Sequence, residues 1–144
     1  MTRRRRKMIK DRIDLLRDDI KNLIETDGDT VVFEWHEMTG GTWNETYEVW
    51  EGGKEERQTY SIRGLGRVVD YKEDEMEYEY GRIGVGEALI RFAYDTDLSP
   101  IMNKEGVRFI YKGQRWKIDS PLGIGESYND NLYTVTIKGV KATD

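Results

Sequence analysis

The stretch GVRFIYKGQRWKIDSP at residues 106–121 decides the fold class, because apolar and polar side chains alternate on both sides of a glycine-containing turn. Alternation over four to eight residues is typical of a half-buried strand, and two such runs joined by a short turn predict a β-hairpin. We therefore expect strands at 107–111 and 114–119. The hairpin carries no histidine, no cysteine and no phosphate loop, so no chemistry is visible in it.

The same period of two recurs through most of the chain after residue 29. Further strands are expected at 30–37, 45–50, 58–71, 88–95 and 132–140. A turn at 38–44 makes 30–50 a hairpin, while 51–56, 72–87, 96–106 and 120–131 are expected to be connections. This pattern, without alternating helices, predicts a mainly β fold: a small antiparallel β-barrel of six or seven strands. Gly64 and Gly66 predict a bulge or bend inside one strand.

An N-terminal α-helix is expected at residues 8–25, because apolar residues recur there at spacings of three and four. They form the stripe Ile9, Ile13, Leu16, Ile20 and Leu23. Gly28 is expected near the C-cap. The stripe packs either on the protein's own barrel or on a neighbouring subunit, and the sequence leaves both readings open. The expected organisation is a basic leader and helix at 1–28, followed by a β-barrel domain at 29–144.

Charge is distributed unevenly along the chain. Residues 1–12 hold seven basic groups and one acid, a local charge of +6, so the net charge of −5 leaves −11 for the remainder. An acidic body repels phosphates and argues against general nucleic-acid binding, whereas the arginine cluster favours it locally. No apolar run approaches the roughly 20 residues of a membrane span, and we expect no secretion signal.

Motifs that carry chemistry are weak in this sequence. There is no cysteine, and His36 is the sole histidine, which leaves it without a second histidine for a metal site or an acid–base pair. The glycine-rich runs RGLGRV and GRIGVGEA do not complete a phosphate loop. The acidic run 73–79 is a solvated loop or an electrostatic surface, since a catalytic carboxylate pair needs two different environments. We expect no catalytic residue, no metal and no cofactor.

Aromatic residues are frequent, and on a small barrel they can form a platform on which bases stack. Trp35, Tyr47, Trp50 and Trp116 are the candidates, but their sequence neighbours are mixed or acidic. We therefore expect barrel core or a subunit interface more than a stacking platform.

Residues 88–139 resemble the head-closure, or stopper, proteins of tailed phages, also called head–tail joining proteins. One strand ends in Phe92, Tyr94 and Asp95, and a hairpin of alternating hydrophobic residues around a glycine follows after a short connection. The hairpin positions that match the family pattern are Val107, Phe109, Tyr111, Gly113, Trp116 and Ile118. The resemblance extends more loosely over 29–140, and the N-terminal helix is longer than in the family.

The resemblance implies a structural virion protein and not an enzyme. It would form a ring of identical subunits below the portal or adaptor protein and above the tail terminator or tail tube protein. Such a ring closes the DNA-filled head and provides the surface on which the tail docks. Its location would be the virion neck, with the host cytoplasm during assembly. Packaged DNA would lie nearby in the channel without sequence-specific binding, and no membrane is involved.

Two sets of residues follow as candidate sites. The resemblance places the long loop at 72–87 toward the central channel; its residues are Glu73, Asp74, Glu75, Met76, Glu77, Tyr78, Glu79 and Tyr80. The docking set combines the basic leader with the helix stripe: Arg3, Arg4, Arg5, Arg6, Ile9, Ile13, Leu16, Ile20 and Leu23. The alternative function is a small β-barrel nucleic-acid-binding module anchored by the arginine cluster. A hydrolase that uses acidic residues is a third and weaker hypothesis.

Overall fold

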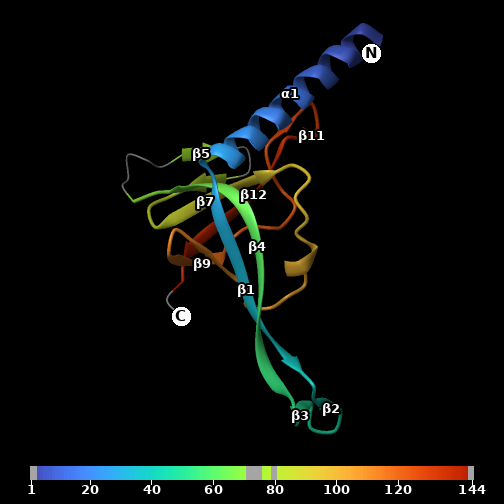
Figure 1. The fold of residues 1–144 in the computed structure, drawn as a ribbon, viewed down its shortest axis with the longest axis vertical. Helices are drawn as coiled ribbons and strands as arrows, with labels where there is room; N and C mark the ends of the chain where they lie inside the picture. Colours follow the sequence, from blue (N-terminus) through green and yellow to red (C-terminus); the bar gives the residue numbers. More distant parts are fainter. Residues whose placement is uncertain (1–2, 71–75, 79–80, 143–144) are drawn as a thin grey trace.

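The structure, a computed structural model, describes residues 3–70, 76–78 and 81–142, and every structural statement below refers to these residues. It is mainly β with one N-terminal helix and a six-stranded antiparallel sheet, as the sequence predicts (Figure 1). The helices are α1 (Arg3–Asp27) and the short 3-10 helix η2 (Ser99–Ile101). The strands of the main sheet are β1 (Asp29–Thr39), β4 (Lys54–Val68), β7 (Glu87–Ala93), β8 (Arg108–Tyr111), β9 (Gln114–Ile118) and β12 (Thr134–Lys141).

Each strand of the main sheet has two neighbours, because the order β1-β4-β7-β12-β9-β8 closes on itself as a barrel through pairing of β8 with β1. The closing register places Val32 opposite Ile110 and Glu34 opposite Arg108. Three small two-stranded ribbons lie outside this sheet. They are β2 (Thr42–Asn44) with β3 (Val49–Glu51), β5 (Met76–Tyr78) with β6 (Gly81–Ile83), and β10 (Ser127–Tyr128) with β11 (Asn131–Leu132).

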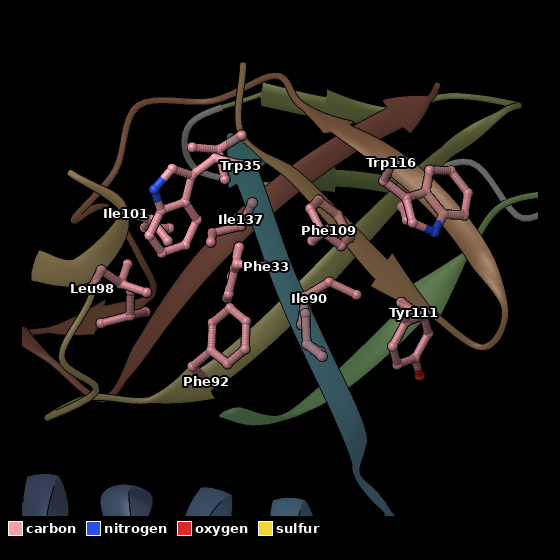
Figure 2. Close-up of a cluster of buried hydrophobic side chains, with 14 residues drawn as sticks. Phe33, Trp35, Ile90, Phe92, Leu98, Ile101, Phe109, Tyr111, Trp116 and Ile137 are labelled. Atoms are coloured by element: carbon pink, nitrogen blue, oxygen red, sulfur yellow. The ribbon is translucent and has the colours of Figure 1, made fainter. Parts of the chain in front are cut away.

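The core lies inside the sheet and is rich in aromatic rings (Figure 2). Phe33 of β1 packs against Phe92 and Phe109, with ring centroids 6.1 Å apart in each pair. Trp116 is 1% exposed and stacks on Phe109. Alternation therefore turns one side of each strand inward, as period-two patterning requires. Trp35 and Trp116 both belong to this core, so a base-stacking platform that includes them is wrong.

The hairpin that opened the sequence analysis forms as expected, with β8 and β9 paired from Arg108–Lys117 to Tyr111–Gln114. Its two-residue turn has positive φ at Lys112 (49°) and Gly113 (77°). Positive φ at both central residues is the signature of a type I′ turn, whose twist matches that of the flanking strands. The glycine in this turn therefore has a geometric reason.

Of the predicted bulge or bend at Gly64 and Gly66, the bulge does not form. Pairing of β4 is continuous with β1 up to Gly64 and with β7 from Leu65 to Val68. A Cβ on Gly66 would lie 2.4 Å from Cζ of Tyr111, and one on Gly64 would lie 2.7 Å from a ring carbon of Phe92. These glycines are needed because aromatic rings of the core press against the backbone of β4.

The helix is longer than the predicted range 8–25, since it begins at Arg3 and ends at Asp27. Arginine and lysine are good helix formers, so the basic leader continues the helix instead of preceding it. Gly28 follows directly and donates its N–H to the carbonyl of Ile24 at 2.9 Å. The expected position of the helix end is therefore confirmed.

The first predicted hairpin has the wrong partner. We expected 30–37 to pair with a returning strand at 45–50, and 51–56 to be a loop. Instead β1 pairs along its whole length with β4, from Asp29–Gly64 to Thr39–Lys54. Residues 45–48 form a turn between β2 and β3. Two glycine pairs, at 40–41 and 52–53, interrupt the alternation and separate the small ribbon from the long one.

Candidate functional site

An extended β-ribbon projects from the barrel and ends at β2 and β3 (Figure 1). We call residues 35–58 the arm and residues 42–51 its tip. Within β1 only Val32, Phe33 and Glu34 pair with β8, so the strand beyond Glu34 has β4 as its one neighbour in the sheet. From Trp35 to Thr39 this ribbon spans about 13 Å, before the tip begins.

The arm is joined to the barrel by a buried carboxylate. Glu34 has a side chain that is 7% exposed, and its Oε1 accepts a bond from Nε of Arg115 at 2.7 Å. Its Oε2 accepts from Nε of Arg57 at 2.8 Å. One carboxylate thus connects β1 with β4 in the arm and with β9 in the barrel. An isolated two-stranded ribbon is only marginally stable in water, so this connection helps to fix the direction in which the arm leaves the barrel.

Glu37, three residues further along β1 than Glu34, makes a second connection between the arm and the barrel. Glu37 accepts a hydrogen bond from Nε1 of Trp35 at 2.8 Å and forms an ion pair with Lys104 at 2.6 Å. The bonds from Lys104 and then from Trp35 hold the pKa of the Glu37 carboxyl below its ordinary value of 4.5. Lys104 follows η2, so this contact ties the arm to a different connection of the barrel.

The tip has an ordered turn. Oδ1 of Asn44 accepts hydrogen bonds from the backbone N–H groups of Thr46 at 3.0 Å and Tyr47 at 3.2 Å, an Asx-type turn. Its Nδ2 donates to Glu51 across the ribbon at 2.8 Å. Glu48 has a positive φ of 53°, which completes the reversal. The turn therefore holds the side chain of Tyr47 outward.

The surface of the tip combines apolar and acidic groups. Tyr47 is 73% exposed, and Trp43 and Val49 are each 47% exposed. The tip also holds three exposed glutamates, Glu45, Glu48 and Glu51. It contains no basic residue. Exposed apolar side chains that gather in one place mark an interaction surface more often than scattered ones do. The tip therefore has the properties of a surface that binds a partner.

Helix α1 is held against the barrel by polar contacts. Arg17 donates from Nε to the carbonyl of Leu132 at 2.9 Å, and its guanidinium lies 3.9 Å from the ring centre of Tyr94. Lys21 pairs with Asp95 at 2.9 Å. That hydrogen bond lowers the pKa of Asp95 from its ordinary 3.8 and raises the pKa of Lys21 from 10.5.

The predicted docking set divides between two environments. Ile13 is buried, and Ile9, Leu16 and Ile20 are partly buried against the protein's own domain. Leu23 is 44% exposed, and Ile24 takes its place in the stripe as a buried residue. The stripe thus packs on its own barrel at its centre, which was the first of the two open readings. Arg6 lies exposed, whereas the side chains of Arg3, Arg4 and Arg5 lie outside the described part.

A groove of about 420 Å³ runs between the N-terminal half of α1 and the β10–β11 ribbon. Its apolar part comes from Ile9 and Ile13, and Arg6, Lys10 and Arg17 supply positive charge. Asp14 is the acid in its lining, and Asn129 and Asn131 complete the wall. Sequence reasoning identified Arg6, Ile9 and Ile13 here but not the wall formed by the distant ribbon.

The predicted channel loop lies mostly outside the described residues. This applies to Glu73, Asp74, Glu75, Glu79 and Tyr80. Met76, Glu77 and Tyr78 form β5, which pairs with β6. The base of the loop is fixed, because Ile83 is buried with Val69 and Leu89.

The glycines at that base are hydrogen-bonded. The N–H of Gly86 donates to the carbonyl of Val69 at 2.9 Å, and that of Gly84 donates to Oε1 of Glu87 at 3.2 Å. Gly86 adopts a positive φ of 82°, which favours glycine. Both glycines therefore shape a fixed turn in this structure.

Three further findings concern the sole histidine, metal binding and membrane spans. His36 lies exposed on the arm opposite Arg57. Within residues 3–70, 76–78 and 81–142 there is no cluster of histidine and acidic side chains that could hold a metal ion. In the same ranges no helix is both long and apolar enough to cross a membrane. No protein-family model matches the chain, and no curated protein matches it.

The arm and its tip were missed by the sequence analysis. Two signals were present: the glycine pairs at 40–41 and 52–53 bracket the segment TWNETYEVWE symmetrically, and Asn44 begins its turn. A segment bracketed in this way is a hairpin placed on the end of another hairpin. The period of two alone does not separate these ribbons.

Proposed function

We propose that the chain is a structural protein of the tailed-phage virion, a ring subunit of the head–tail connector. It would lie below the portal or adaptor protein, close the DNA-filled head and offer the surface on which the tail docks. The observation that carries the proposal is the arm, because a ribbon with an apolar and acidic tip extends beyond the barrel and presents a binding surface. Assembly proteins need such reach, and catalysis does not.

The β8–β9 hairpin supports the same proposal in a different way. Most of the residues that carry the resemblance lie in this hairpin or directly before it, and Val107, Phe109, Tyr111 and Trp116 are buried in the core. The family pattern therefore corresponds here to a scaffold that fixes the positions of the projecting segments. Its role is mechanical, because a ring that resists packaged DNA needs rigid walls.

The loop at 72–87 is proposed as the part nearest the channel axis. Repetition by rotational symmetry would bring its acids together, where they would repel one another and DNA phosphates within about 10 Å at ordinary salt. The acids are Glu73, Asp74, Glu75, Glu77 and Glu79. Replacing all five by the corresponding amides should reduce the number of filled heads that keep their DNA. Normal retention of DNA would remove the loop from the proposal.

The test of the function is a deletion of the coding sequence in the phage that carries it, with the chain supplied from a plasmid as the control. We expect electron microscopy to show separate tails and heads that lose their DNA, and joined particles when the plasmid is present. Joined, infectious particles without the chain would refute the proposal. A gene order with portal, protease and capsid genes upstream and tail genes downstream is a further expectation.

A nucleic-acid-binding module is the second candidate, and one observation favours it. The first turns of α1 carry the densest positive charge of the chain, and Arg6, Lys7 and Lys10 are exposed. The measurement is binding of duplex and single-stranded DNA at several salt concentrations. Micromolar or tighter binding at physiological salt, lost when Lys7 and Lys10 are changed to glutamate, would favour this function. Binding only at low salt would reflect nonspecific attraction to phosphates.

A further inference from the structure

We propose that the tip of one copy binds in the groove beside α1 of a second copy. This proposal rests on the proposed function, because the contact would join neighbouring subunits of the ring. The occupant of the groove is thus the segment 42–51 of another identical chain.

Charge complementarity is the first reason. The tip carries Glu45, Glu48 and Glu51 with no basic residue, whereas residues 1–12 carry a local charge of +6. Lys10 and Arg6 line the groove itself. In a protein whose remaining residues are strongly acidic, the N-terminal half of α1 is a surface that attracts the tip electrostatically instead of repelling it.

Apolar complementarity is the second reason. Ile9 and Ile13 supply the apolar part of the groove. The exposed apolar side chains of the tip are Trp43, Tyr47 and Val49. A volume of about 420 Å³ lies within the range of pockets that enclose small ligands. An aromatic side chain such as Tyr47 buries a large area at a low cost in conformational entropy, which makes it a suitable anchor.

The fold determines that the contact is made between copies. The tip and the start of α1 lie at opposite ends of the molecule (Figure 1), so one chain cannot fill its own groove. Two different surfaces that bind one another form a heterologous contact, which gives a closed ring when the rotation between copies closes. A symmetric dimer would need two contacts at once, which is a separate outcome that the experiment detects.

A second basic hollow lies beside η2 and is lined in part by Lys104, Arg108 and Lys117. It fits the tip less well, because positive charge is denser in residues 1–12, which hold seven basic groups, and because Glu37 of the same arm pairs with Lys104 beside this hollow. The groove beside α1 is therefore the better acceptor.

Cross-linking tests the contact directly, because the native chain has no cysteine. A full-length Tyr47→Cys variant is mixed with a Lys10→Cys variant under mild oxidation, and the disulfide-linked heterodimer is quantified. The control mixture pairs Tyr47→Cys with Val85→Cys, since Val85 is 52% exposed and lies outside both surfaces. We expect the first mixture to cross-link about tenfold faster than the control. Equal rates would overturn the proposal.

Charge reversal supplies an independent readout. One variant carries Glu45→Lys and Glu48→Lys, and the other carries Lys7→Glu and Lys10→Glu. Sedimentation velocity at low salt should show that wild-type chains associate into species larger than dimers and that each variant alone stays monomeric. Their mixture should associate again, because the intact tip of one variant meets the intact groove of the other and the two reversed surfaces are also opposite in charge. Circular dichroism checks that each variant is folded.

The remaining outcomes have fixed meanings. A symmetric dimer that survives both reversals would overturn the proposal, as would wild-type chains that stay monomeric and do not cross-link. Binding of duplex DNA by α1 without any effect of the tip variant on association would assign the groove to nucleic acid instead. These experiments use purified chains, so they test the contact independently of the phage. The contact can be absent although deletion in the phage gives the expected phenotype, and it can be present although deletion has no effect.

Discussion

Nε of Arg115, on β9, lies 2.7 Å from Oε1 of Glu34, on β1, and this bond fixes the arm to the barrel wall. Glu34 is buried and Arg115 is half exposed, so the carboxylate depends on its two arginine partners for solvation. Glu34→Gln removes the charge and keeps the shape. We expect the free energy of unfolding to fall by roughly 1.5–3 kcal/mol, the contribution of hydrogen bonds to charged groups. Urea unfolding measures it.

The control for Glu34 is Glu56→Gln, because Glu56 is an exposed carboxylate on the same ribbon. Its substitution should change stability by no more than about 0.5 kcal/mol. Equal effects at both positions would show that the buried ion pair does not stabilise the arm.

Trp116 tests the core around the β8–β9 hairpin. The side chain is 1% exposed and stacks on Phe109, so Trp116→Ala should destabilise the fold by about 3–5 kcal/mol. Its Nε1 is buried, and no acceptor for it occurs among the described groups. Trp116→Phe removes that N–H and keeps a ring, so it should cost clearly less than alanine. Thermal unfolding of the two variants measures both effects. If Trp116→Ala has the same melting temperature as the wild type, Trp116 does not pack in the core in this way.

The fold class was predictable from the sequence because it depends on local alternation. The β8–β9 hairpin shows this: inward positions such as Phe109 and Trp116 carry the apolar side chains, and the glycine marks the turn. The partner of β1 was not predictable in the same way. Alternation indicates a strand but not its neighbour, and the nearer run at 45–50 was chosen over the true partner, β4.

The candidate surfaces were only partly predictable for a related reason. The stripe of α1 follows from spacing, but whether Ile24 or Leu23 is buried depends on where the barrel meets the helix. Gly66 has its role because Tyr111, distant in sequence, presses on the strand. The groove beside α1 likewise needs Asn129 and Asn131 from the far end of the chain. Such long-range contacts leave no periodic signal.

The centre of the helix stripe can be tested by stability. Ile13 is 4% exposed, so Ile13→Ala should lower the free energy of unfolding by about 2–4 kcal/mol. Leu15 is 61% exposed on the same helix, and Leu15→Ala should have little effect. Denaturant titration of both variants separates the two readings of the stripe. If Ile13→Ala has no more effect than Leu15→Ala, the helix does not pack on its own barrel in solution.

The Lys21–Asp95 pair predicts a pH dependence. The pKa of Asp95 is lowered in the folded state by its bond to Lys21, so the pair stabilises the fold above the ordinary value of 3.8. That contribution is lost as the pH falls through the lowered pKa. Asp95→Asn should therefore be less stable than the wild type at pH 6, with a difference that shrinks toward pH 3. The difference is small because both side chains are about half exposed. A difference that grows on acidification would contradict the sign.

Shortening the arm separates folding from assembly. Replacing the tip, residues 42–51, by an Asn-Gly turn removes Tyr47 and the three glutamates but leaves the bonds of Glu34 and Glu37 in place. Since the core lies inside the sheet and the tip adds nothing to it, the melting temperature should stay within a few degrees of the wild type. Particles assembled with the shortened chain should instead fail to join heads to tails, because the projecting surface is gone.

The matched control for the shortened arm keeps its length and removes only its apolar anchor. Tyr47→Ser leaves the Asx turn intact, because Asn44 accepts from the backbone N–H groups of residues 46 and 47. If binding depends on the aromatic side chain, this variant should join heads to tails at least about tenfold less often than the wild type, as loss of a buried anchor does elsewhere. If Tyr47→Ser is normal and the shortened arm is defective, the ribbon acts through its reach. Normal joining by both variants would show that the arm is not the assembly surface.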